Sequence, residues 1–323
     1  MPQPSSQHLR AAPFDGDVRG HLLELPVTQN DQIQPQKVYG PDGATQTLSI
    51  ANGGAGQSGL IGALALGFID YVTSSRGNLR QDPLLPPPFP FTVGWYLGDT
   101  TQSLDYIEHN LVDIAVTYNK AAELQSLKDG FSCKRIYGFR DRFMLVGPEE
   151  NPADLDSDND DILAMFNKIN KSGKQIPPTD PPTRFLSRYD KSATNIKESS
   201  LFTLIGQVPW AYAYSTWYHQ YARFPLEALK AASLLSEYTI TDYGTYLSSP
   251  EQVQDDVVIY KKSTGDEDDL LLNPAHVLLR TGAQDNIYAT AFMRWMASAD
   301  GGQAVVANYA INGDVLYLPA PKE

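Results

Sequence analysis

The strongest constraint on the fold is a regular alternation of short apolar strands and amphipathic helices that begins near Gln46. The strand-like segments TLSI, FTVGWYL and DIAVTYN are separated by helix-like segments that start at Ser58 and near SLDYIEHN. Strands joined through helices pair in parallel, because each crossover packs its helix against a face of the sheet. The pattern therefore predicts an α/β fold with a parallel sheet flanked by helices.

The chain after DIAVTYN continues with further strands and helices of different composition. FRDRFMLVGP is a strand closed by Gly147-Pro148, FLSR and LLLNPAHVLL are strands, and ATAFMRWMASADGGQAVVANYA is a helix pair. The acidic run DLDSDNDD begins like a calcium loop, but Asn159 stands at its sixth position and Met165 at its twelfth. We interpret the run as the solvated start of the helix ILAMFNKINK, since acidic residues favour a helix N-terminus.

Composition excludes several classes of function. The 25 basic and 38 acidic residues give a formal net charge of −13, which disfavours nucleic acid as a partner. Cys133 is the only cysteine, so no internal disulfide and no thiolate zinc site is expected. No cofactor and no metal is predicted. The longest apolar run, GLIGALALGFIDYV, is shorter than the roughly 20 residues that span a bilayer.

The first residues, about 1–35, are expected to form a polar N-terminal arm without a hydrophobic signal segment. An extracellular or periplasmic location is favoured if a signal peptide has been removed, and a cytoplasmic one otherwise. The segment Arg80 to Pro90 carries five prolines, which predicts a stiff surface connection.

A glycine-rich turn, NGGAGQSG, follows the first strand and opens the first helix. GAGQSG, from Gly54 to Gly59, fits G-x-G-x-x-G, and free backbone amides at a helix start favour an anion. A dinucleotide site would need an acidic residue about 20 positions on, and Asp99 lies well beyond that. The turn also lacks the lysine of a Walker loop and misses the G-x-S-x-G spacing by one place. A tight turn without a ligand remains open.

The segment SRYDKSATNIKE, from Ser187 to Glu198, offers a second anion site. Arg188 ends a strand and carries a fork of N–H donors, while Ser192 and Thr194 fall where a helix begins. Such a set suits a small tetrahedral oxyanion. The alternative is an ordinary helix N-cap beside a surface ion pair.

Other chemistry-bearing residues show no catalytic pattern. The five histidines have no partner at helical metal-ligand spacing and are predicted to be structural or exposed; they are His8, His21, His109, His219 and His276. The aromatic residues of PWAYAYSTWYHQY would suit a sugar or base platform, but their near-helical spacing favours a core stripe.

Several segments, in the same order along about residues 48–319, resemble the substrate-binding proteins of bacterial tungstate ABC transporters. SRYDKSATNIKE is similar to that family's S-R-G-D-x-S-G-T-H-x-x-E, and YTITDYGTY to its Y-T-L-T-D-R-G-T-Y. FRDRFMLVGPEENPADL, LLLNPAHVLL and WMASADGGQAVVANYAINGDVLYLP resemble its hinge strands and C-terminal helix and tail.

The resemblance implies a two-lobed type II periplasmic binding protein fold with a central ligand cleft and two hinge-crossing strands. It places an N-terminal arm at 1–43, lobe one at 44–145 and 271–323, and lobe two at 146–270. The implied protein is a monomeric solute-binding protein and not an enzyme, with tungstate or molybdate as its ligand and a membrane transporter as a possible partner. The implied ligand-binding residues are Asn52, Gly53, Gly54, Thr100, Thr101, Ser187, Arg188, Ser192, Thr194, Thr241 and Tyr243.

Two departures from the family pattern bear on the ligand. Ala51 to Gly56 replaces a Thr/Ser-rich T-T-T-S-T-Q loop, which removes hydroxyl donors and leaves more room. Tyr243 replaces an arginine. The alternatives are therefore a binding protein for another anionic metabolite, or an enzyme on the same fold, for which His219 and Cys133 are the candidate residues.

Overall fold

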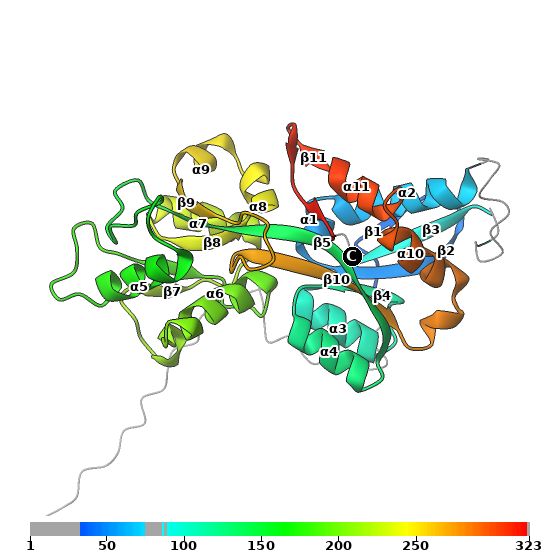
Figure 1. Ribbon diagram of the computed structural model, residues 1–323, viewed down its shortest axis with the longest axis horizontal. Helices are drawn as coiled ribbons and strands as arrows, with labels where there is room; N and C mark the ends of the chain where they lie inside the picture. The colour runs from blue at the N-terminus through cyan, green and yellow to red at the C-terminus, as the bar shows by residue number, and fades with distance from the viewer. Residues whose placement is uncertain (1–32, 75–85, 87–88, 322–323) are drawn as a thin grey trace, which may run out of the picture.

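Two long strands join two lobes of the molecule (Figure 1). The computed structural model describes residues 33–74, 86 and 89–321. Strand β5 (Ser132–Gly147) pairs antiparallel with β10 (Leu272–Arg280) in one lobe. Its far end pairs with β8 (Thr239–Asp242) and β9 (Val258–Lys262) in the other. This is the predicted two-lobed α/β fold, with β5 and β10 as the crossing strands.

The main sheet of lobe one has the order β1-β3-β2-β4-β10-β5-β13. Its further strands are β1 (Lys37–Tyr39), β2 (Thr45–Asn52), β3 (Phe91–Leu97), β4 (Ile114–Thr117) and β13 (Leu318–Pro319). As predicted, β2 runs parallel to β3 and β4. β1 lies within the segment assigned to the N-terminal arm and pairs with β3, so the sheet begins before residue 44.

Helices cover both faces of this sheet. One face packs against α2 (Leu60–Thr73), α10 (Ile287–Ala297) and α11 (Gly302–Asn308), through a core that includes Phe68, Phe292 and Trp295. The other face packs against α3 (Thr100–Glu108), and α4 (Lys120–Lys128) lies beside α3. The short helix α1 (Gly54–Gln57) follows β2 directly.

Lobe two is built around an aromatic core of Phe166, Phe185, Phe202, Trp217 and Tyr218. Its remaining elements are α5 (Ile162–Gly173), β6 (Phe185–Ser187), α6 (Ala193–Leu204), η2 (Pro209–Ala211), β7 (Tyr218–Gln220), α7 (Pro225–Leu234), α8 (Tyr243–Ser248) and α9 (Glu251–Asp255). The C-terminal part adds η3 (Ala283–Asp285), β11 (Ala310–Ile311) and β12 (Asp314–Val315).

The acidic run before α5 is a helix start, as predicted. The Asp161 carboxylate accepts a hydrogen bond from the Ala164 amide at 2.7 Å and caps the helix. Asp156 accepts hydrogen bonds from the amides of Asp158 and Asn159, both at 3.0 Å, within an exposed turn. The carboxylates of Asp156 and Asp161 thus accept hydrogen bonds from backbone amides of their own segment.

The prediction of a helical aromatic stripe in PWAYAYSTWYHQY is wrong. Trp217 and Tyr218 are buried, but Tyr212 is 63% and Tyr214 is 82% exposed. The cause is the pairing of β7 with β6, which imposes an extended backbone on Tyr218–Gln220 after a turn around Ser215. Tyr212 and Tyr214 precede the strand and face outward.

Three predicted features lie wholly or mostly outside the described residues: the arm before residue 33, the proline-rich segment at 80–90, and His8 and His21. Within the described ranges, no helix combines the length and the apolar character that a bilayer crossing needs.

Candidate functional site

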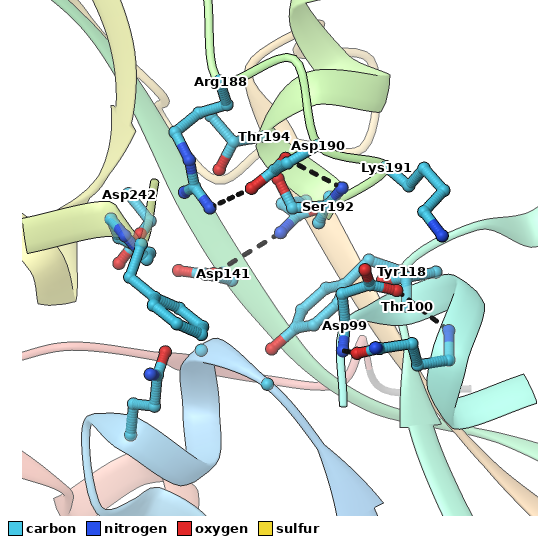
Figure 2. A pocket seen from close by; sticks show the side chains of 18 of the residues that line it. Asp99, Thr100, Tyr118, Asp141, Arg188, Asp190, Lys191, Ser192, Thr194 and Asp242 are labelled. Carbon is cyan, nitrogen blue, oxygen red and sulfur yellow. Dashed lines mark hydrogen bonds and ion pairs between the residues drawn. The ribbon is translucent and has the colours of Figure 1, made fainter. Parts of the chain in front are cut away.

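A cleft of about 790 Å³ lies between the lobes and is walled by both of them (Figure 2). Lobe one contributes the turn after β2, the start of α3 and the end of β4, with Tyr118. Lobe two contributes the loop from Arg188 to Thr194, the segment from Ala222 to Pro225, and Asp242. The crossing strands supply Asp141, Phe143 and Asn273. The site therefore spans elements that are far apart in the sequence.

Six of the eleven residues predicted to bind the ligand line this cleft; they are Gly53, Gly54, Thr100, Arg188, Ser192 and Thr194. Five of them lie at the starts of α1, α3 and α6, and Arg188 follows β6 directly. The first amides of a helix have no acceptor within the helix, and the helix dipole is positive there. Both lobes therefore present helix starts to the cleft.

The other five predicted residues are not part of the lining: Asn52, Thr101, Ser187, Thr241 and Tyr243. Ser187 and Thr241 are buried in β6 and β8. The Tyr243 ring lies against Lys262, whose Nζ is 3.3 Å from its centroid, and against Arg142. The replacement of the family's arginine by Tyr243 thus places an aromatic ring among cations beside the cleft.

Asn52 has a structural position under the glycine-rich turn. It is fully buried, its amide donates to the Val116 carbonyl at 2.8 Å, and its Oδ1 accepts from the Gly56 amide at 2.7 Å. Gly56 itself packs on the Trp95 indole so closely that a Cβ would lie 2.2 Å from it. Both ends of the Asn52 amide are thus occupied by the backbone, and Gly56 allows close packing against Trp95.

Arg188 is the most enclosed cation of the cleft. Its side chain is 5% exposed and pairs with the Asp190 carboxylate. Its Nε finds no hydrogen-bond partner among the residues that the structure describes. The loop beyond it holds Tyr189 and Lys191 at φ of 46° and 62°, a left-handed backbone that glycine adopts more easily. The guanidinium is therefore held in place by Asp190, with one buried donor, Nε, left unpaired among the described residues.

Glu198, on α6, forms a hydrogen bond with Ser187, the residue before Arg188. It is fully buried and accepts hydrogen bonds from the Ser187 hydroxyl and from Asn195 Nδ2, the latter at 2.7 Å. Burial raises the pKa of Glu198 to about 7, against the lowering effect of those hydrogen bonds and of the Arg188 charge. The carboxyl group thus titrates near neutral pH directly below the Arg188 backbone.

This placement predicts a pH-dependent stability. The pKa of Glu198 rises from 4.5 unfolded to about 7 folded, so the folded state binds the extra proton. The contribution of Glu198 to the free energy of unfolding is therefore fully present below the unfolded pKa of 4.5. It falls as the pH rises through the folded pKa of about 7, by at most about 1.4 kcal/mol per pH unit. Glu198→Gln is expected to lose this contribution to the slope, as measured by denaturant unfolding at several pH values.

The exposed carboxylate Glu108, at the end of α3, provides the control. Glu108→Gln should keep the wild-type slope between about pH 5 and pH 8. Equal slopes in wild type and Glu198→Gln would contradict a buried, titrating Glu198.

Carboxyl groups in the cleft were missed from the sequence. Asp99, Asp141, Asp190 and Asp242 all line it, beside the cations Arg188, Lys191 and Arg223. Burial and the charge of Asp242 raise the pKa of Asp141 well above its usual range. For Asp141, the available sequence signal was a carboxylate in the hinge strand FRDRFMLVG, which is apolar from Phe143 onward. The described residues hold no cluster of three or more metal-ligating side chains.

The two candidate catalytic residues of the enzyme alternative lie elsewhere. Cys133 is exposed on β5, and the His219 Nδ1 is 2.9 Å from Glu237 Oε2 in lobe two. His109 bonds the Asp105 carbonyl, and His276 is buried in β10. None of these four side chains lines the cleft.

Comparisons with known proteins agree with this architecture. Residues 87–300 match the model of a PBP superfamily domain. A solved structure described as a "periplasmic putative metal binding protein" is 50% identical, covers 89% of this chain and 100% of its own, and superposes with a TM-score of 0.80. Tungstate-binding protein TupA of Peptoclostridium acidaminophilum is 29% identical, over 65% of this chain and 68% of its own. A "putative ABC transporter anion-binding protein" of Haloferax volcanii is 25% identical, over 86% and 73%.

Two lobes, two crossing strands and a cleft walled from both sides define a two-lobed binding protein. The family match covers more than half of the chain. The chain belongs to the PBP superfamily, the family of periplasmic binding proteins.

Proposed function

We propose that this protein captures a small oxyanion, of the tungstate or molybdate class, in the cleft and presents it to a membrane transporter. The observation that carries the proposal is Arg188, a buried guanidinium that lines the cleft and keeps an unpartnered Nε among the described residues. A guanidinium fork matches the oxygen geometry of tetrahedral anions and donates charge-assisted hydrogen bonds.

Neutral donors from the helix starts complete the proposed site. Thr194, 6% exposed, lies in the first turn of α6, behind the N-cap Ser192. Thr100, 5% exposed, begins α3 across the cleft. Helix N-termini bind anions through free amides and a favourable dipole. One arginine with such donors holds an oxyanion without any catalytic base, which supports binding rather than turnover.

The relatives support the same class of ligand. TupA is named for tungstate, and the archaeal relative for anion binding and an ABC transporter. The 50% identical structure is described as periplasmic. We therefore infer that this protein acts outside the cytoplasm in oxyanion uptake.

A second candidate ligand is a larger molecule with an anionic head. The cleft of about 790 Å³ exceeds what a tetrahedral oxyanion fills, and Leu97, Phe143 and Phe224 add apolar walls. A natively purified sample that shows a bound organic acid by mass spectrometry would favour this candidate, and a clean apo spectrum would weaken it.

Isothermal titration of the dialysed protein with tungstate, molybdate, sulfate and phosphate tests the primary proposal. We expect tungstate or molybdate to bind with a Kd below about 1 μM, a free energy near −8 kcal/mol. Absence of heat with all four anions, in protein that unfolds cooperatively, would contradict an oxyanion of this class.

A further inference from the structure

Asp141 occupies the floor of the cleft at the point where β5 passes from one lobe to the other. Its register partner on β10 is Asn273, and two residues further along β5 Phe143 pairs with Asp242 of β8. Asp141 is only 6% exposed, yet it lines the same cleft as Arg188. Figure 2 shows the carboxyl groups of Asp141 and Asp242 and the Arg188 guanidinium around one hollow.

The carboxyl groups of Asp141 and Asp242 differ in the hydrogen bonds that they accept. Asp242 accepts at both oxygens, from the Thr245 amide at 2.8 Å and from the Thr245 hydroxyl at 2.6 Å. Asp141 accepts from the Arg142 amide at 2.8 Å, while Asn273 Nδ2 lies 3.4 Å from its other oxygen. Donors stabilise the ionised form of a carboxyl group. Asp141 is almost fully buried and one of its two hydrogen bonds is as long as 3.4 Å, so the ionised form of this carboxyl group is weakly stabilised.

The other groups that face Asp141 do not neutralise it. Tyr118, after β4, and Tyr317, before β13, are buried phenols, and burial raises the pKa of both well above the usual value. The Arg142 guanidinium donates to the Val315 carbonyl and lies over the Tyr243 ring. Burial is therefore the largest influence on Asp141, the charge of Asp242 is the next, and both raise the pKa of Asp141.

We propose that Asp141 is a ligand-contacting residue whose protonated carboxyl donates a hydrogen bond to the bound oxyanion. The inference rests on the proposed oxyanion function and names a residue through which the site selects its ligand. A doubly charged oxyanion beside two ionised carboxylates would be repelled, whereas a shared proton converts one repulsive group into a donor. Where Asp141 is ionised in the free protein, binding takes up one proton from solvent.

Proton-linked binding is measured by titrating the whole protein with tungstate in buffers of different ionisation enthalpy. Between about pH 6 and pH 9 tungstate itself does not titrate, so any pH dependence belongs to the protein. For wild type we expect the Kd to rise with pH, by at most tenfold per unit, with uptake of up to one proton per anion. Asp141→Asn keeps a donor but cannot titrate. In a Glu198→Gln background, which removes a second titrating carboxyl group, with a pKa of about 7, beside Arg188, it is expected to bind tungstate with a nearly constant Kd, whereas Glu198→Gln alone should keep the pH dependence.

Two variants sharpen the test. Asp242→Asn retains an N-cap for α8 and removes the competing charge, so the rise in Kd should move to lower pH. Asp99→Asn removes a carboxylate from the same cleft at the N-cap of α3, and should keep the pH dependence of wild type.

Each outcome decides the question. Tungstate binding by wild type with neither pH dependence nor proton uptake overturns the role of Asp141 and leaves the oxyanion function intact. An equal pH dependence in Glu198→Gln with and without Asp141→Asn overturns it as well, as does loss of binding in that double variant at every pH, since a donor remains there. Absence of binding in wild type and every variant overturns the oxyanion function and this inference with it.

Discussion

Arg188→Ala is expected to weaken tungstate or molybdate binding by at least about thirtyfold, because truncating one partner of a buried charge pair costs about 2–5 kcal/mol. Arg188 contributes the most enclosed cation of the cleft, and Asp190 stays behind when it is removed. The remaining carboxylate then repels the anion that the guanidinium attracted. Isothermal titration at constant ionic strength measures the loss, since exposed charges are screened by salt.

Arg223→Ala is the matched control for Arg188→Ala. Arg223 lines the same cleft and carries the same charge, but its side chain is exposed. A surface charge contributes about 0–1 kcal/mol, so its loss should change the Kd by only a few fold. Equal weakening by both substitutions would show that only the net charge of the cleft matters, and would contradict a defined oxyanion site at Arg188.

Asn52→Ala is expected to lower the free energy of unfolding by about 1–3 kcal/mol, because two buried backbone groups each lose a hydrogen bond to Asn52 and only the Gly56 amide keeps another acceptor, the Gly53 carbonyl. Those groups are the Val116 carbonyl and the Gly56 amide. Urea unfolding, followed by tryptophan fluorescence, measures the change. The glycine-rich turn loses its link to β4 in this variant, so weaker ligand binding should accompany the lower stability.

Thr101→Ala is the control for Asn52→Ala. Thr101 was predicted beside Asn52 as a ligand contact, but it is half-buried on α3 outside the cleft lining. Its removal should change stability by no more than about 0.5 kcal/mol. If Asn52→Ala instead kept wild-type stability and lost only tungstate binding, Asn52 would be a ligand contact and not a structural residue.

Much of the fold could be predicted from periodicity. FTVGWYL is β3 residue for residue, and the helices α2, α5 and α10 begin within a few residues of their predicted starts. Signals of this kind are local, since capping residues and apolar spacing act within one element. Helix α4 was missed because its buried residues are the polar Glu123 and Ser126, so KAAELQSLK shows no apolar face; Asn119 caps the helix and Glu123 pairs with Arg135.

The candidate site was predicted in part, for a physical reason. Arg188, Ser192 and Thr194 share one loop and helix start, so their spacing in the sequence already indicated a joint role. Asp141 and Asp242 meet only because β5 pairs with β8, which no local pattern shows. Asn52 and Ser187 adjoin the cleft residues in sequence, yet their side chains turn into the interior. The direction of a side chain depends on the packed structure and not on spacing alone.

The crossing strand β5 has a mechanical consequence. It pairs with β10 up to Arg142, the Phe143 amide still donates to the Leu271 carbonyl, and β8 and β9 pair with it from Phe143 and Met144 onward, so the change of partners falls within the three residues after Asp141. Rotation of one lobe against the other is therefore expected to twist the backbone at this junction, where Asp141 lies. A ligand that touches Asp141 would act on the axis of the rotation itself. Binding of a ligand in the cleft would then affect the opening and closing of the lobes directly at the hinge, without a change in the interior of either lobe.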